Sequence, residues 1–184
     1  FTFIYVGRII PHKNIQTAIE AFIKAFGKGN DYLFRVVGTG ESLDDLKEYY
    51  KNRRNICFEG AKFGSDLVEA YHTSHVLVIP SLYEPWGLVV NEALSAGMPV
   101  LASDRVGARY DLIDGRDTGF IFDPENIEQL AGLMKKIADD RSLYIRQSKN
   151  AAALMKDEWN YDLYRKNLTK AIEFVDRKLH RSGS

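Results

Sequence analysis

The chain has 184 residues, 45% of them hydrophobic, which is enough for one compact domain with a sizeable core. No apolar run approaches membrane-spanning length, and 25 basic residues balance 25 acidic ones, so the composition disfavours an integral membrane protein and a nucleic-acid binder that depends on net positive charge. The single cysteine, Cys57, can form no internal disulfide and stands in an apolar stretch, where we expect it in the core.

Short apolar segments alternate with amphipathic helical segments along most of the chain. The predicted strands cover residues 3–7, 33–37, 56–59, 76–79, 100–102 and 120–122, and helices are predicted between them at 15–26, 43–51, 66–72, 88–96 and 108–113. Strands this apolar, joined by crossover helices, are covered on both faces and form a parallel sheet. The pattern predicts a Rossmann-like α/β fold, a parallel sheet flanked by helices.

The last third of the chain contains no further predicted strand. Three helices are predicted at residues 127–138, 143–155 and 161–179, and we expect them to form a closing layer on the sheet. The late aromatic residues Trp159, Tyr161, Tyr164 and Phe174 are expected to pack in that layer. Residues 181–184 have the composition of a loose tail, and the chain opens on Phe1 rather than Met, from which we expect it to be part of a longer protein.

In a doubly wound sheet, ligands bind beyond the carboxyl ends of the strands, so the loops there are the first place to look for chemistry. The loop after the first predicted strand contains Gly7, Arg8 and Lys13. The glycine permits close approach of a ligand to the backbone, and the two cations can both reach a diphosphate. A solvated loop whose cations pair with nearby acids is the alternative for Arg8 and Lys13.

The loop after the second predicted strand is a Gly-x-Gly turn, with Gly38 and Gly40, that leads into a helix. Two interpretations remain open, a phosphate-binding turn and a tight turn that needs glycine for backbone reasons alone. The turn lacks the full Gly-x-Gly-x-x-Gly spacing and does not follow the first strand, so it does not indicate a dinucleotide site.

The loop after the fourth predicted strand holds the most informative segment, which runs from Ser81 to Leu94. Glu84 stands in the loop, Gly87 at the start of the next helix and Glu92 within that helix. The first amides of a helix have no intrahelical partner and favour an anion, so a phosphate can bind there while the two glutamates accept bonds from hydroxyl groups. This combination predicts a nucleotide-sugar site.

In this context the chain resembles the retaining glycosyltransferases of the GT-B fold, and within them the glycosyl transferases group 1 family. The resemblance covers nearly the whole chain, and Glu84 and Glu92 match the family's E-x7-E motif. The other matching segments are Gly7-Arg8 with Lys13, residues 37–40, 58–60 and 80–81, residues 84–87, 91–93 and 97–100, and the pairs 114–115 and 118–119.

The resemblance implies a role for each matching residue. Arg8 and Lys13 would hold the donor diphosphate, assisted by Gly38, Gly40 and the backbone around Gly87, Leu88 and Val89. Glu92 would bind the ribose hydroxyls, and the base would lie near Ala61 and Lys62. Glu84 would be catalytic, lying against the donor sugar and stabilising the positively charged transition state.

The chemistry that the resemblance implies is transfer of a sugar from a nucleoside diphosphate donor, linked to UDP, GDP or ADP, to an acceptor hydroxyl with retention at the anomeric carbon. No cofactor and no metal are expected. His72 and His75 are expected to pack or to face solvent, because no acids or cysteines stand near them. Three positions depart from the family pattern: Asp111 stands where a glutamate is usual, His75 replaces an acid, and Asn14 replaces a glycine.

A GT-B enzyme has two Rossmann-like domains, and this chain would supply only the C-terminal, donor-binding one, over residues 1–180. The N-terminal acceptor domain, with its glycan or lipid-linked acceptor, would precede Phe1, and the fragment alone would turn over little. We expect cell-envelope polysaccharide or lipopolysaccharide synthesis, a cytoplasmic location, peripheral membrane association and no nucleic acid partner. Two alternatives remain, a non-catalytic nucleotide-binding or scaffold domain of the same fold and a nucleotide-sugar epimerase.

Overall fold

The computed structural model describes residues 1–29 and 31–181, with side chains to residue 178. A parallel sheet forms its centre, with the strand order β3-β2-β1-β4-β5-β6. The strands are β1 (Thr2–Val6), β2 (Leu33–Val37), β3 (Ile56–Gly60), β4 (Val76–Ile79), β5 (Val100–Ser103) and β6 (Gly119–Phe122). This order and the parallel pairing confirm the predicted Rossmann-like sheet.

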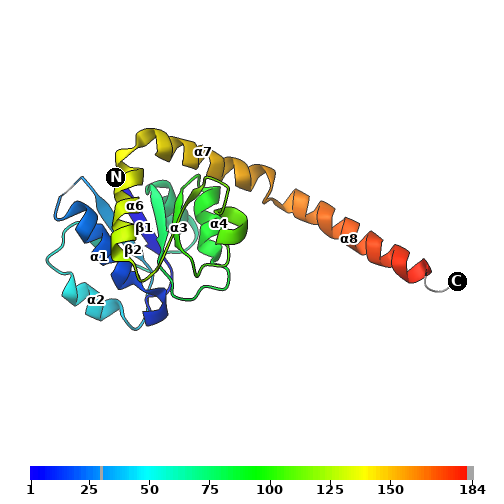
Figure 1. Ribbon diagram of the computed structural model, residues 1–184. Coiled ribbons are helices and arrows are strands. Elements are labelled where there is room, and N and C mark those ends of the chain that lie inside the picture. Colours follow the sequence, from blue (N-terminus) through cyan, green and yellow to red (C-terminus); the bar gives the residue numbers. More distant parts are fainter. Residues whose placement is uncertain (30, 182–184) are drawn as a thin grey trace.

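The helices lie on both faces of the sheet, as the crossover pattern requires (Figure 1). They are η1 (Pro11–Lys13), α1 (Ile15–Phe26), α2 (Leu43–Tyr49), α3 (Gly64–His72), α4 (Leu88–Ser95), α5 (Arg109–Leu112), α6 (Ile127–Asp139), α7 (Arg141–Asp157) and α8 (Tyr161–Arg181). The hydrophobic periods in the sequence locate helices α1 to α8 to within a few residues of their observed bounds, whereas the short helix η1 falls in the predicted loop after β1.

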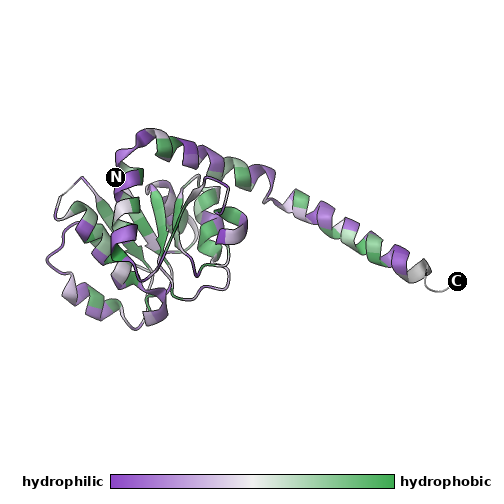
Figure 2. Ribbon diagram, viewed as in Figure 1, coloured by the Kyte–Doolittle hydropathy of each residue, from purple (hydrophilic) through white to green (hydrophobic). Residues whose placement is uncertain are grey.

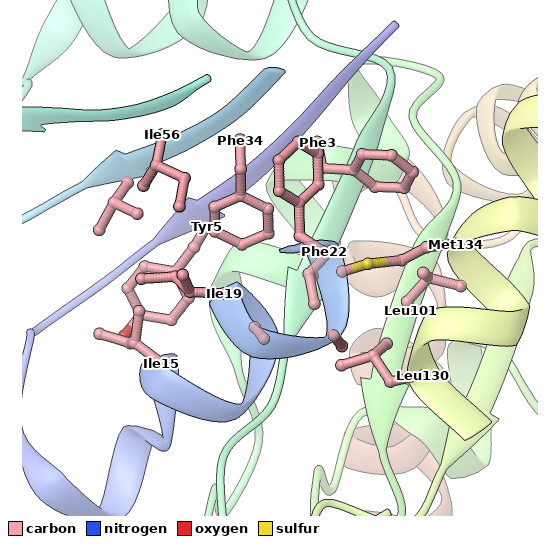
Figure 3. Close-up of a cluster of buried hydrophobic side chains, with 14 of the residues drawn as sticks. Phe3, Tyr5, Ile15, Ile19, Phe22, Phe34, Ile56, Leu101, Leu130 and Met134 are labelled. Carbon is pink, nitrogen blue, oxygen red and sulfur yellow. The ribbon is translucent and has the colours of Figure 1, made fainter. Parts of the chain in front are cut away.

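Alternation along each strand divides the core into two clusters, because successive side chains point to opposite faces of a sheet. Phe3 and Tyr5 of β1 face α1, α2 and α6, whereas Ile4 between them faces α3, α4 and α7. Figure 3 shows the first cluster, where Phe22 of α1 packs against Phe3 and Phe34. The strands are therefore buried on both faces, and their carboxyl ends are held in fixed relative positions.

Helix α8 is where the structure departs from the predicted closing layer. Helix α6 packs on α1 and α7 packs on α4, but α8 projects away from the sheet (Figure 1). Tyr161 is 91% exposed, and Tyr164 and Phe174 are also largely exposed. The expectation of packing is therefore wrong for Tyr161, Tyr164 and Phe174, whereas the ring of Trp159 lies 5.6 Å from that of Trp86. Apolar and polar residues alternate along α8 where it lies away from the domain (Figure 2).

Two smaller expectations also change. Cys57 is partly exposed on β3 rather than in the core, although burial raises the pKa of its thiol. Arg181, predicted to belong to the tail, is the last residue of α8, and residues 182–184 of that tail lie outside the described residues. Within the part of the chain that the structure describes, no helix is both long enough and apolar enough to span a membrane.

Candidate functional site

The candidate site lies where the direction of the sheet connections reverses. Strands β1 and β4 are neighbours, but β1 continues outward to β2 and β3, whereas β4 continues to β5 and β6 on the other side. The loops that leave two such strands diverge and leave a crevice at their carboxyl ends. The residues after Val6 and after Ile79 border this crevice.

A pocket of about 220 Å³ occupies the crevice. It brings together six of the residues predicted from sequence, three from the loops after β1 and β4 and three from the start of α4. They are Arg8, Lys13, Glu84, Gly87, Leu88 and Val89. Two segments that are distant in sequence thus combine cations, a carboxylate and a helix terminus in one space.

Lys13 and Glu84 form an ion pair across this pocket. Each side chain is only 14% exposed, so the pair is partly shielded from water and each charge offsets the other. Lys13 is the last residue of η1, and Arg8, at the opposite end of the same loop, is exposed. An anion that enters the pocket would therefore meet one exposed cation and one that it must share with Glu84.

The first turn of α4 presents its backbone to the same pocket. Gly87 is the N-cap residue in a left-handed conformation, with φ of 94°, and no side chain caps the helix. The Val90 amide donates to the Gly87 carbonyl at 2.8 Å, whereas the Leu88 and Val89 amides have no acceptor among the described residues. A helix that begins with free amides favours a bound anion at that end.

The backbone of Glu84 is held by the loop that follows β5. The Glu84 amide donates to the Arg105 carbonyl at 3.2 Å, and the Gly107 amide donates to the Glu84 carbonyl at 2.9 Å. These bonds hold the Glu84 backbone at the edge of the pocket although the loop has no regular structure. Asp111, the predicted departure in this region, is exposed on α5 and is not among the residues that line the pocket.

Gly38 and Gly40 do not line the pocket but support the loop that does. A Cβ atom on Gly38 would lie 1.8 Å from the Gly7 carbonyl oxygen, and one on Gly40 would lie 2.2 Å from the Ile9 carbonyl oxygen. The Ile9 amide donates to the Thr39 carbonyl at 2.8 Å, which joins the two loops. Of the two interpretations of the Gly-x-Gly turn, this packing favours the one based on the backbone.

Lys62, also predicted to bind the nucleotide, lies beyond the end of β3 and not in this pocket. Its Nζ atom is 3.2 Å from an oxygen of Glu59, which also accepts a 2.9 Å bond from Arg35. The bond from Arg35, helped by Lys62, lowers the pKa of the Glu59 carboxyl below its usual range. The structure therefore places Lys62 in a charged cluster on the β3 side of the sheet.

Glu92 lies one turn beyond the pocket, on α4. It lines a second, larger groove of about 940 Å³ between α3, α4 and the start of α8, and Leu88 borders both spaces. Tyr71 of α3 donates its hydroxyl hydrogen to Glu92 Oε2 at 2.7 Å. The two members of the E-x7-E pair thus face different spaces that meet at Leu88.

Sequence reasoning missed two tyrosines that contact the site. Tyr71 holds Glu92, and Tyr5 of β1 donates its hydroxyl hydrogen to the Arg8 carbonyl at 2.7 Å. Burial, followed by the negative charge of Glu84, raises the pKa of Tyr5, so its hydroxyl remains a donor. The sequence does contain a signal for Tyr5: a tyrosine in an otherwise apolar, buried strand needs a hydrogen-bond partner for its hydroxyl group.

Comparisons with known proteins identify the family of the chain. The sequence model of the family Glycosyl transferases group 1 matches residues 1–154. A curated relative from Escherichia coli, UDP-Gal:alpha-D-GlcNAc-diphosphoundecaprenol alpha-1,3-galactosyltransferase, is 32% identical over 82% of this chain and 39% of its own length. An uncharacterised glycosyltransferase of Methanocaldococcus jannaschii is 30% identical over 86% of the chain, which covers 41% of that relative. The chain therefore spans about two fifths of their length.

Solved structures share the fold. The C-terminal domain of a glycosyl transferase group 1 family protein from Francisella tularensis aligns with a TM-score of 0.78 at 25% identity, over 88% of this chain and 87% of that one. Anabaena HepE in complex with UDP and glucose aligns with a TM-score of 0.80 at 20% identity, over 94% and 48% respectively, and shows the fold alone. The chain thus belongs to the glycosyl transferases group 1 family and has the α/β sheet of the GT-B glycosyltransferases.

Proposed function

We propose that this domain binds the nucleoside diphosphate sugar donor of a retaining glycosyltransferase. One observation supports the proposal most directly: the pocket at the carboxyl ends of β1 and β4 combines Arg8 and the Lys13–Glu84 ion pair with the free amides that begin α4. A diphosphate carries negative charge that these groups can neutralise without a metal. Neither a cofactor nor a metal is part of the proposal.

The same groups supply the chemistry of sugar transfer. When the bond between the sugar and the diphosphate breaks, negative charge develops on the leaving phosphate and positive charge on the sugar ring. Arg8, Lys13 and the α4 amides stabilise the first charge, and the carboxylate of Glu84, which lies beside them, stabilises the second. Fixed charges of this kind cost no reorganisation during the reaction, and loss of one group typically costs a hundredfold or more in rate.

We further propose that an N-terminal domain completes the acceptor side in the full-length protein, and that this chain alone transfers little sugar. The support is the coverage of about two fifths of the curated relatives. The galactosyltransferase relative acts on a diphosphoundecaprenol-linked sugar according to its name, and this supports a role in cell-envelope glycan synthesis. A cytoplasmic enzyme that approaches a lipid-linked acceptor from that side fits the same role.

Calorimetric titration of the chain with UDP, GDP and ADP tests the donor site. We expect one nucleotide to bind saturably, and Lys13→Ala and Glu92→Ala each to weaken that binding about tenfold or more, because charge-assisted contacts are lost. Lys51→Ala and Glu48→Ala are matched controls, since these residues form an exposed ion pair on α2 and the turn that follows it. The controls should bind like the parent chain.

The outcomes separate the candidate functions. A folded chain that binds none of the three nucleotides, or binds one equally well after both site substitutions, contradicts the proposed donor site. The alternative of a scaffold domain predicts that Glu84→Ala leaves sugar transfer by the full-length protein unchanged. A retaining transferase predicts that transfer falls by about a hundredfold or more and that the product keeps the anomeric configuration of the donor.

A further inference from the structure

The contact between Tyr71 and Glu92 joins two helices at the edge of the groove beside the donor pocket. Tyr71 stands near the end of α3 and is 5% exposed, whereas Glu92 stands on the second turn of α4 and is exposed. The tyrosine hydroxyl and Glu92 Oε2 are 2.7 Å apart. A buried donor thus holds one oxygen of a carboxylate that is otherwise open to the groove.

The electrostatics fix the direction of this bond. Burial, followed by the bond to Glu92 and its charge, raises the pKa of Tyr71, so the phenol keeps its proton and donates a hydrogen bond to the carboxylate. The other oxygen, Oε1, accepts no hydrogen bond from the described residues. Glu92 therefore has one anchored oxygen and one that can accept hydrogen bonds from a ligand.

We propose that Tyr71 is a positioning residue that orients the Glu92 carboxylate toward the ribose hydroxyls of the donor nucleotide. The inference rests on the proposed function, because it is Glu92 that contacts the ligand. A free glutamate side chain would lose rotamer freedom when it binds, and the bond from Tyr71 has already removed part of that freedom. Tyr71 itself touches no substrate and acts only through Glu92.

The variant Tyr71→Phe tests this role, because phenylalanine keeps the ring that packs in the core beside α4 and removes only the hydroxyl group. The probes are the nucleotide that binds the parent chain, UDP, GDP or ADP, and its 2′-deoxy form. We expect Tyr71→Phe to weaken binding of the ribonucleotide by roughly three- to tenfold and to change binding of the 2′-deoxy form less than about twofold. A purely structural role would weaken both probes equally.

A double-mutant cycle adds a second readout. In the Glu92→Gln background, Tyr71→Phe should have almost no further effect on ribonucleotide binding, because the carboxylate that it orients is gone. Tyr32→Phe is the control for loss of a phenol, since Tyr32 directly precedes β2 at the opposite end of the strands and stacks on Phe26. Urea unfolding of each variant confirms that it is folded.

The failures of the two proposals are distinguishable. If Glu92→Gln weakens nucleotide binding but Tyr71→Phe does not, or if Tyr71→Phe weakens ribonucleotide and 2′-deoxynucleotide equally, the role of Tyr71 is wrong and the donor site stands. If neither Lys13→Ala nor Glu92→Gln weakens nucleotide binding, the proposed donor site is wrong, and the role of Tyr71 is wrong with it.

Discussion

Some charged side chains at this site already have bonding partners within the protein, and the proposed donor would have to compete with those partners. Lys13 is the clearest case, because the carboxylate of Glu84 neutralises its charge inside a partly buried pocket. In the proposed donor site, a diphosphate would therefore compete with Glu84 for the same ammonium group. Arg8 is exposed and has no carboxylate partner among the described residues, so it would be free to pair with a phosphate of the proposed donor.

Removal of the negative charge of Glu84 should change nucleotide binding and sugar transfer in opposite directions. We expect Glu84→Gln to strengthen binding of a nucleoside diphosphate by about fivefold, since a neutral amide holds Lys13 less strongly. The same variant should lower sugar transfer by the full-length protein, because the charge opposite the reacting sugar is lost. Calorimetry and a transfer assay measure the two effects. Equal or weaker nucleotide binding by Glu84→Gln would contradict this account of the ion pair.

Arg35 and Glu59 allow a test of how charge contributes to stability. The bond from Arg35 lowers the pKa of Glu59 below its usual value of 4.5. The unfolded chain therefore takes up a proton at Glu59 before the folded chain does, and the stabilisation is complete above about pH 4.5 and lost as the pH falls through the lower folded pKa. Glu59→Gln should be less stable at pH 7 and should lose less stability on acidification.

Urea unfolding at a series of pH values measures this dependence. Glu41→Gln is the control, because Glu41 is exposed in the turn before α2, and its curve should follow that of the parent chain. If the Glu59→Gln curve keeps the full slope below pH 4.5, the acid sensitivity of the domain arises elsewhere.

At the scale of elements, the loops after β1 and β2 pack backbone against backbone. Gly38 has φ of 145°, and a methyl group there would overlap the carbonyl of Gly7. The hydrogen bond from the Gly7 amide to the Val37 carbonyl, 3.0 Å long, continues the pairing of the two strands into this contact. The position of Arg8 therefore depends on the absence of a side chain in a different loop.

We expect Gly38→Ala to lower the free energy of unfolding by about 2–4 kcal/mol, because one of the two loops must move. Gly132 provides a matched control, since it lies within α6 with nothing within 4 Å of an added methyl group. Gly132→Ala should raise stability by about 0.5–1 kcal/mol. Chemical denaturation measures both, and equal effects of the two substitutions would contradict the close packing.

The elements themselves were predictable from sequence, whereas their side-chain partners were not. Apolar runs such as residues 76–79 and the period of 3.6 in residues 15–26 are local signals, and they locate β4 and α1 with the observed bounds. The contacts of Tyr5 with Arg8 and of Tyr71 with Glu92 depend on how separate elements meet. An amphipathic pattern also does not say which surface a helix packs on, so the pattern of α8 did not reveal that it projects outward.

At the scale of the whole molecule, the sheet with its two helix layers is self-sufficient and α8 is an appendage. We expect the free energy of unfolding of a chain that ends at residue 160 to lie within about 1 kcal/mol of that of the full chain. The reason is that most of the apolar side chains of α8 are exposed. Urea unfolding of both chains tests this expectation. A loss of several kcal/mol would mean that α8 packs on the domain in solution.

Because α8 projects outward, a small rotation at its junction with α7 would move its far end a long way. Its 21 residues span about 30 Å, and it joins α7 through a short segment around Glu158 and Trp159. A rotation of about 10° at that junction would displace the far end of α8 by about 5 Å. Because Trp159 and Tyr161 also line the groove that contains Glu92, such a pivot would transmit movement between that groove and any surface that the end of α8 contacts.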